Sequence, residues 1–407
     1  MAAFFCSLLV FPLTATSTRA MPMFARKYGV NCSTCHTTAP RLNETGYRFR
    51  AAGFRMPEEI GRTSEEPFDI LDYFSARLQV RTGATRTKVG PLTTTTHQTL
   101  VQALEFYPLT GSWGKYFSSN IKVTFAPVSS PAVAIENLYA KVNRGNEHQF
   151  FSARAGVFHP YDGYGASDSP ATISRPLFQT TPANLNQSTF FLTWGLDSSG
   201  VEVGFDSGRN SVRATVFSGA VVGNQDGRFS VTAGPLAKRS AGPTYSAPDF
   251  QVFVNHVLNP KGGGLSFQYY HGNLSLPVTG TANFFRNNFD RAAVYASYPL
   301  MKRLQVFGAY QYGRDHTVSR STFSSAGTFV EAAVPIKGMT AAGVRYDWFD
   351  PARAKASNEI SGVTAYVNAW FFSQLRIIGQ YQHLTTKRDS LPTQTDDAFQ
   401  IRIIYFK

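Results

Sequence analysis

Cysteine and charge are both scarce in this chain. Only three of its 407 residues are cysteine, too few for a fold held together by disulfides. Charged residues make up 16% of the sequence, below the share of about a quarter that is usual in soluble domains. After residue 20 no apolar run approaches the ~18 residues that a membrane-spanning helix needs, which argues against a helical membrane protein.

Motifs for common enzymatic chemistry are also missing. The segment 192–204, LTWGLDSSGVEVG, lacks the Gly-x-Ser-x-Gly turn of serine hydrolases, and no phosphate-binding glycine loop occurs. We therefore expect neither a hydrolase nor a transferase. The formal net charge is +13, from 39 Lys and Arg against 26 Asp and Glu. Because the basic residues are scattered at alternate positions rather than clustered, we expect no nucleic-acid partner.

Residues 1–20, MAAFFCSLLVFPLTATSTRA, have the pattern of a signal peptide. Their apolar stretch at 4–13 is too short to span a bilayer, and Thr-Arg-Ala at 18–20 is an acceptable cleavage site. Cleavage would remove Cys6 and leave two cysteines in the mature chain. We therefore predict export from the cytoplasm.

The two remaining cysteines form Cys32-x-x-Cys35-His36 within NCSTCH. A structural zinc site needs four ligands, and no second Cys or His pair with suitable spacing follows. A thioredoxin-like redox site needs a strand–helix context, and a histidine after the second cysteine is not its signature. Covalent haem c needs two thiols one helical turn apart for its vinyl groups and an adjacent imidazole for its iron. The motif supplies all three, so we predict one covalent haem c.

The segment around this motif, residues 21–65, is expected to form a small helical haem c unit. A helix should start near Asn43 and end at Gly53, and Pro57 prevents its continuation. About forty residues cannot bury a haem alone, so the segment needs a further surface. The aromatic residues expected to cover the haem edge are Phe24, Tyr28, Phe49 and Phe54.

Residues 66–407 alternate between apolar and polar side chains, as in SNIKVTF at 119–125. Short and long polar connections also alternate, which predicts an all-β transmembrane barrel of about 16 antiparallel strands, each roughly ten to thirteen residues long. A soluble all-β protein is the alternative. The expected short turns are 109–115, 144–147, 207–210, 259–263, 299–302, 335–339 and 371–374. The expected long loops are 86–97, 127–131, 159–188, 222–247, 273–287, 315–325, 350–357 and 386–395.

The sequence PMFARKYGVNCSTCHTTAPRLNETGYRF, followed by a barrel of this size, resembles the fused outer-membrane cytochrome–porins of iron-oxidising bacteria. The resemblance is specific over residues 22–57 and architectural over the barrel. It implies that Cys32 and Cys35 carry the haem thioethers and that His36 is an axial ligand of the iron. The haem segment would act as a plug or cap of the barrel, and the barrel would be embedded in outer-membrane lipid.

The same resemblance implies electron transfer in the bacterial outer membrane, from extracellular Fe(II) through the haem to a periplasmic c-type cytochrome. Two alternatives remain open: outward electron export to an extracellular acceptor, and a diffusion porin in which the haem is structural. Reduction potential would separate inward from outward transfer.

The second axial ligand of the iron is less clear from the sequence. Met56, in FRMP, is the leading candidate, and a methionine would raise the haem potential. Met21 and Met23 are weaker candidates. No Asp, Glu and His cluster has metal-ligand spacing, and Asp162 and Asp168 are expected in a solvated loop. The histidines of the barrel are expected to be single wall or loop residues: His97, His148, His159, His256, His271, His316 and His383.

Two further expectations concern the pore. The loop 159–188 is the third external loop, and we expect it to fold inward as a wall above the haem. Five basic residues are expected to face the lumen and to make it net basic, slowing the entry of free cations. They are Arg77, Arg81, Lys122, Arg345 and Arg376.

Overall fold

The structure is a computed structural model that describes most of the chain. Residues 1–20 and Met21 lie outside the described part, as does the predicted boundary between haem segment and barrel at 65/66. The described ranges are 22–38, 40–62, 69–126, 133–163, 171–180, 198–217, 229–230, 248–277, 284–301, 304–317, 322–354, 358–371, 374–388 and 391–407.

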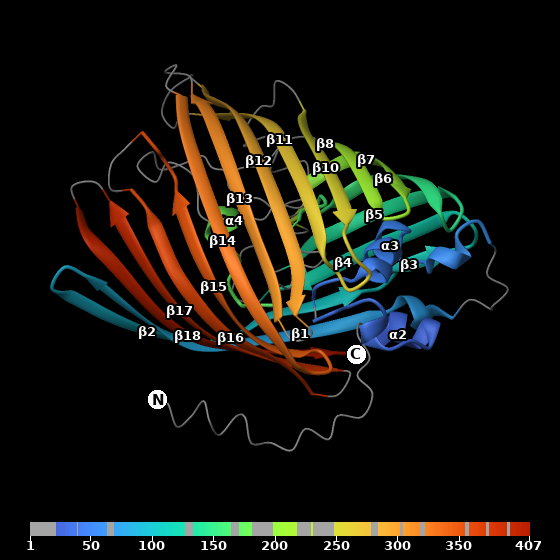
Figure 1. Ribbon diagram of the computed structural model, residues 1–407, viewed down its shortest axis with the longest axis horizontal. Coiled ribbons are helices and arrows are strands. Elements are labelled where there is room, and N and C mark those ends of the chain that lie inside the picture. Colours follow the sequence, from blue (N-terminus) through green and yellow to red (C-terminus); the bar gives the residue numbers. More distant parts are fainter. Residues whose placement is uncertain are drawn as a thin grey trace.

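The described strands form one antiparallel sheet that closes on itself, because β1 pairs with both β2 and β18 (Figure 1). Apart from the short β3 and β9, this is a closed barrel of 16 strands, which confirms the predicted all-β barrel of about 16 antiparallel strands. The strands are β1 Ser75–Val89, β2 Leu92–Tyr107, β3 Gly111–Trp113, β4 Phe117–Phe125, β5 Val133–Gly145, β6 Gln149–Phe158, β7 Ser198–Ser207, β8 Asn210–Phe217, β9 Phe229–Ser230, β10 Asp249–Val257, β11 Gly264–Pro277, β12 Phe284–Met301, β13 Leu304–Thr317, β14 Thr322–Lys337, β15 Thr340–Asp350, β16 Ile360–Phe371, β17 Leu375–Arg388 and β18 Leu391–Phe406.

Side chains alternate between a buried polar inner face and an exposed apolar outer face. In β8, Arg213 and Thr215 are each 1% exposed, whereas Val212 and Val216 are 44% and 47% exposed. The same inversion recurs in β15, where Arg345 is buried and Val344 is exposed. A soluble barrel would bury the apolar face instead, so the soluble alternative is wrong. An apolar outer surface suits contact with lipid.

The seven expected short turns all coincide with connections at one end of the barrel. Four of the expected long loops are wrong in extent, because strand pairing continues through much of 86–97, 273–287, 315–325 and 386–395. As a result β2, β14 and β18 reach 16 residues, and β12 reaches 18. In 92–99, LTTTTHQT, the β-branched threonines favour extended structure although the segment is polar.

Helical structure is sparse in the described residues. The α-helices are α2 Pro22–Tyr28, α3 Glu44–Ala51 and α4 Leu177–Thr180, and the 3-10 turns are η1 Cys32–Thr34, η2 Pro57–Glu59 and η3 Ile70–Tyr73. Within the part of the chain that is described, no helix is long and apolar enough to cross a membrane. The predicted helix at Asn43 is confirmed as α3: Asn43 caps its N-terminus, and Gly53 follows its end with a positive φ of 70°.

The described N-terminal residues 22–62, called the N-terminal segment below, lie at the short-turn end of the barrel (Figure 1). The backbone N–H of Glu44 donates to Pro260 in the β10–β11 turn. Three inward-facing barrel side chains also bind the segment: Lys141 of β5 donates to Ala51 O, Gln305 of β13 accepts from Thr38, and Glu331 of β14 pairs with Arg41. The segment is therefore held by the lumen wall as well as by the turns.

Candidate functional site

The Cys32–His36 turn has a fixed backbone. The N–H groups of Cys35 and His36 both donate to the carbonyl of Cys32, at 3.1 and 2.9 Å. The side-chain amide of Asn43 donates to the carbonyls of Ser33 and Thr34, at 3.2 and 3.0 Å. One residue, Asn43, thus caps α3 and holds the turn against it.

Close packing of α3 on this turn requires a glycine. A Cβ added to Gly46 would lie 2.1 Å from the carbonyl oxygen of Cys35, closer than any real contact. The helix therefore approaches the motif at backbone distance. This arrangement accounts for the position of Gly46 in the first turn of α3, where a better helix former would otherwise be expected.

The imidazole of His36 is set up as a neutral ligand. Its Nδ1 lies 3.2 Å from the carbonyl oxygen of Pro40, and because a carbonyl only accepts, Nδ1 carries the proton. Burial and, to a smaller extent, the nearby positive charge of Arg376 together lower the pKa of His36 to about 4, although hydrogen bonds to the carbonyls of Pro40 and Arg41 act in the opposite direction. At neutral pH the ring is uncharged, and the lone pair of Nε2 is available to a metal.

The thiols differ from those of a redox-active pair. Cys32 and Cys35 are not joined in a disulfide. Burial raises the pKa of the Cys35 thiol to about 11, whereas redox-active cysteines have a lowered pKa. The motif therefore lacks the electrostatics of a thiol–disulfide exchange site.

Cys32 is 2% exposed and packs against an apolar patch on the lumen wall. A larger apolar cluster, which includes Phe217 and Phe329, lies elsewhere inside the barrel, so this patch is one of several on an otherwise polar inner face. The aromatic rings of Trp370 and Phe406 stack within it, with centroids 5.6 Å apart. The residues of this patch are Ile173, Met339, Trp370, Ile378, Ile404 and Phe406. An apolar surface beside the motif suits the body of a porphyrin.

Arginine side chains border the apolar patch. Arg376 and Arg402 are 2% and 7% exposed and lie on the inner faces of β17 and β18. Their charges interact with each other and with Arg77 of β1. The positive charge of Arg376 also lowers the pKa of His36, so this arginine group lies beside the Cys32–His36 turn.

The structure does not bring Met56 to this site. Met56 is 7% exposed, and its neighbour Arg55 donates to the carbonyls of Gly114 and Lys115 in the β3–β4 turn. Ile60 packs with Phe150 of β6. These contacts dock the Met56 region on the β4–β6 wall, whereas Cys32 packs against β16–β18. Its assignment as second axial ligand stays a prediction.

The other candidate residues of the N-terminal segment form a small core of their own. Phe24 lies 5.1 Å from both Phe49 and Phe54, measured between ring centroids, and Tyr28 lies 5.6 Å from Phe49. These rings pack α2 on α3, and their role as a cover for the haem edge stays a prediction. Met23, adjacent in α2, is fully buried.

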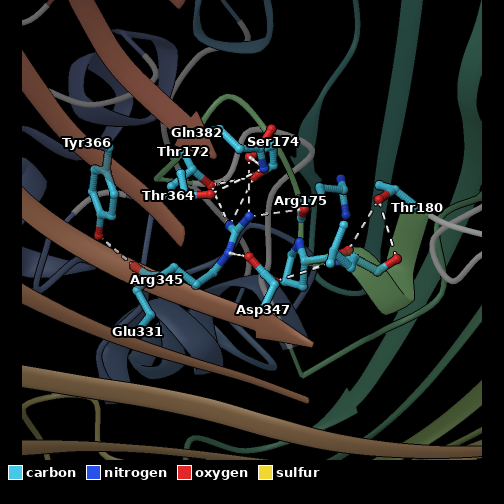
Figure 2. A network of polar contacts seen from close by, with 12 residues as sticks. Thr172, Ser174, Arg175, Thr180, Glu331, Arg345, Asp347, Thr364, Tyr366 and Gln382 are labelled. Carbon is cyan, nitrogen blue, oxygen red and sulfur yellow. Dashed lines mark hydrogen bonds and ion pairs between the residues drawn. The ribbon is translucent and has the colours of Figure 1, made fainter. Parts of the chain in front are cut away.

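The loop after β6 folds into the barrel, as expected, over its described residues 171–180 (Figure 2). Arg345 of β15 donates to Thr172 Oγ1 at 2.8 Å and to the carbonyl of Ser174 at 3.0 Å. Gln380 of β17 accepts from the N–H of Ile173 at 2.7 Å. Ile173 thereby reaches the apolar patch, so the loop and the N-terminal segment meet at Cys32. The period-two pattern predicted that Arg345 faces the lumen, but it did not indicate that Arg345 and Gln380 anchor this loop.

The prediction of a net basic lumen is wrong, because carboxylates pair with several of the inward-facing basic residues. Arg77 pairs with Glu105, Lys122 with Glu136, and Arg345 with Asp347. Three of the five predicted basic positions are thus compensated, and net repulsion of cations by the whole wall is not expected. The acidic partners could have been predicted from the sequence, because Glu105 and Asp347 occupy inward positions in the same period-two pattern.

Asp162 also differs from expectation. It is 6% exposed rather than solvated, and its carboxylate lies 3.2 Å from His159 Nε2. Asp168 lies outside the described residues. Among the residues that the structure describes, no three His, Cys, Asp or Glu side chains converge as a metal site. His256, His271, His316 and His383 have polar partners on the barrel wall.

Comparisons with known proteins bear on the barrel. No family model and no curated protein matches the chain. Among solved structures, an anion-selective porin from Comamonas acidovorans is similar with a TM-score of 0.55 and 12% identity, over 82% of this chain and 99% of that one. The outer-membrane channel DcaP of Acinetobacter baumannii gives 0.54 and 12%, over 86% and 100%. OmpT of Vibrio cholerae gives 0.53 and 14%, over 82% and 99%.

At these identities the likeness concerns the fold, which is that of outer-membrane porins. A porin fold with an apolar outer surface agrees with the predicted localisation in the bacterial outer membrane.

Proposed function

We propose that this protein transfers electrons across the outer membrane through a single haem c held at Cys32, Cys35 and His36. Extracellular Fe(II) would be the electron donor and a periplasmic c-type cytochrome the acceptor, as in the cytochrome–porin fusions that the N-terminal sequence resembles. The observation that carries this proposal is the His36 ring, whose Nδ1 lies 3.2 Å from the carbonyl oxygen of Pro40, beside the apolar patch on which Cys32 packs.

The residues present fit a haem. The turn brings the thiols within one turn of each other, as two thioether bonds require, and the carbonyl of Pro40 orients the His36 ring. The apolar patch excludes water from one side of the site. When bound, the haem supplies a one-electron Fe(III)/Fe(II) couple, whose potential depends on axial ligation and burial.

Two parts of the chain bind inward-facing side chains of the barrel, which supports conduction of electrons rather than of solutes. The N-terminal segment is bound at the short-turn end, which is the periplasmic end in barrels of this type. Residues 171–180 cross above it. A periplasmic cytochrome would dock on the exposed side of the N-terminal segment, and Fe(II) would approach from the opposite mouth.

The porin-like fold favours a second candidate, a diffusion porin with a structural haem. One of the similar structures is described as anion-selective, and the arginines beside Cys32 are compatible with such a role. Conductance separates the two functions, because a diffusion porin passes ions steadily in a planar bilayer. The outward-export alternative is separated by the haem potential, which would then be strongly negative.

The test uses purified full-length protein in detergent. A pyridine haemochrome spectrum should report one covalent haem, and rapid mixing with Fe(II) should produce the reduced α-band. The matched control is Cys32→Ala/Cys35→Ala, which should fold as a barrel and show neither signal. Wild-type protein that carries haem but is not reduced by Fe(II) would refute the assigned donor, and wild-type protein without haem would refute the site.

A further inference from the structure

Two buried hydrogen-bond donors beside Cys32 have no acceptor among the residues that the structure describes. They are the indole Nε1 of Trp370 and the guanidinium Nε of Arg402. The two residues are 6% and 7% exposed. Burying a donor without an acceptor is energetically costly, so native interiors rarely leave one unpaired.

Strand register places these donors on one surface. Trp370 of β16 is directly opposite Arg376 of β17, and Arg376 is in turn opposite Ile404 of β18. The guanidinium carbon of Arg376 lies 5.7 Å from the centre of the Trp370 ring. Arg402 lies opposite Ile378, one inward position further along the barrel. The donors therefore flank the apolar side chains on which Cys32 packs.

Water is a poor partner for these donors. A buried water needs two to four polar contacts that include acceptors for its own protons, whereas the side chains around Trp370 and Arg402 are the apolar Ile378, Ile404 and Phe406 and the guanidinium of Arg376, which only donates. The Nη2 group of Arg402 donates to the backbone carbonyl of Ile173 at 3.4 Å, and this contact leaves the Nε donor of the same side chain without an acceptor among the described residues. An anionic acceptor attached to an apolar body would satisfy the donors and cover the patch at once.

We propose that Trp370, Arg376 and Arg402 bind the propionate carboxylates of the haem. This assignment rests on the proposed function, because it takes the haem to be joined at Cys32 and Cys35. Arginine suits a carboxylate, since its planar N–H groups match the two oxygens, and an indole N–H adds a neutral donor. Arg376 is already held at one side, because its Nε donates to Asn368 Oδ1 at 2.9 Å.

The test substitutes single donors in the full-length, haem-loaded protein. Trp370→Phe keeps an aromatic ring that can stack on Phe406 and removes only the N–H. Arg402→Gln removes the charge and the guanidinium, and Arg402→Lys restores the charge alone. The matched controls are Trp113→Phe, whose Nε1 has Ser119 Oγ as acceptor at 2.7 Å, and Arg291→Gln, whose guanidinium binds Asp315 at 2.9 Å. Heat modifiability on gels verifies a folded barrel in each variant.

Two measurements report on the haem carboxylates independently of electron transfer from Fe(II). The propionate bending band in resonance Raman spectra should shift in Trp370→Phe and in Arg402→Gln and remain unchanged in both controls. The midpoint potential should fall in Arg402→Gln, because a nearby cation favours the reduced haem, and should return toward the wild-type value in Arg402→Lys.

The outcomes separate this assignment from the function on which it rests. If wild-type protein carries covalent haem and neither Trp370→Phe nor Arg402→Gln changes the Raman band or the potential, the propionate site is wrong and the haem site stands. If wild-type protein carries no covalent haem, the proposed function fails, and the propionate site fails with it.

Discussion

Replacing Arg41 with methionine should release the N-terminal segment from the lumen wall. Arg41 Nη2 lies 2.5 Å from Glu331 Oε1, and the two side chains are 16% and 1% exposed. Arg41 also lies over the ring of Phe307, 5.1 Å from its centre. Glu331 belongs to β14 and accepts a second hydrogen bond from Tyr366 at 2.6 Å. Without Arg41, the buried Glu331 side chain would keep, within the described part of the chain, the Tyr366 hydroxyl as its hydrogen-bond donor.

The expected cost follows from that burial. Removing one member of a buried ion pair costs about 3–5 kcal/mol, because the other charge is left uncompensated. The Tyr366 hydrogen bond keeps the value near the lower end. About 3 kcal/mol corresponds to roughly a 150-fold larger population of the undocked segment, since every 1.4 kcal/mol is a factor of ten.

Native-state proteolysis with chymotrypsin measures this population. The segment contains aromatic cleavage sites, such as Phe49 in α3, which is 7% exposed while docked. When opening is fast relative to cleavage, the cleavage rate follows the open population. We therefore expect Arg41→Met to be cleaved within the segment about two orders of magnitude faster than wild type, with the barrel intact.

Two matched variants test whether the burial of the Arg41–Glu331 ion pair causes the faster cleavage. Arg209→Met removes the exposed partner of Glu44, where the side chains are 42% and 24% exposed, so its cost should stay below ~1 kcal/mol. Adding Glu331→Met to Arg41→Met removes both buried charges and should bring the rate back toward wild type. Equal acceleration in Arg41→Met and Arg209→Met would refute the reasoning, as would a double variant cleaved as fast as the single one.

Three further predictions concern the haem motif, the inward loop and the orientation. Cys35→Ala should leave at most one thioether, so the peroxidase stain of a denaturing gel should weaken sharply, and full staining of the Cys32→Ala/Cys35→Ala protein would contradict the motif. Arg345→Leu removes the hydrogen bonds that hold 172–175 in the lumen, so single-channel conductance in planar bilayers should rise, and an unchanged conductance would show that the loop is held by other contacts. A tag at Gly208, in the β7–β8 turn beside the N-terminal segment, should stay unlabelled on intact cells, and surface labelling there would reverse the assigned topology.

The barrel could be predicted from the sequence because its determinants are local. Side-chain alternation defines the two faces of each strand, and turn residues mark the short connections. Gly208 and Gly338 adopt φ values of +54° and +58° in the predicted turns. The length of the strands could not be predicted in the same way. Polar threonine runs such as 93–96 have the composition of a loop, yet they pair with β1 for their whole length.

The Cys32–His36 turn and helix α3 could also be predicted from local sequence, but the part of the barrel wall that faces them could not. Which inward residues meet Cys32 depends on the closure of the ring and on the path of the 171–180 loop. One signal was present: adjacent isoleucines at 377–378 and 403–404 place one apolar side chain on each face of a strand. In a membrane barrel the inward position is normally polar, so Ile378 and Ile404 marked the apolar patch.

The apolar patch beside Cys32 is completed late in the assembly of the barrel. Ile404 and Phe406 belong to β18, which closes the ring against β1, so the patch is complete only after the barrel has closed. Cys32 precedes every strand in the sequence, yet in the finished protein it is 2% exposed. If Cys32 carries the proposed haem, the enzyme that forms its thioether bond would need to reach this thiol while the N-terminal segment is undocked. Haem attachment would then precede the docking of the segment against the closed barrel.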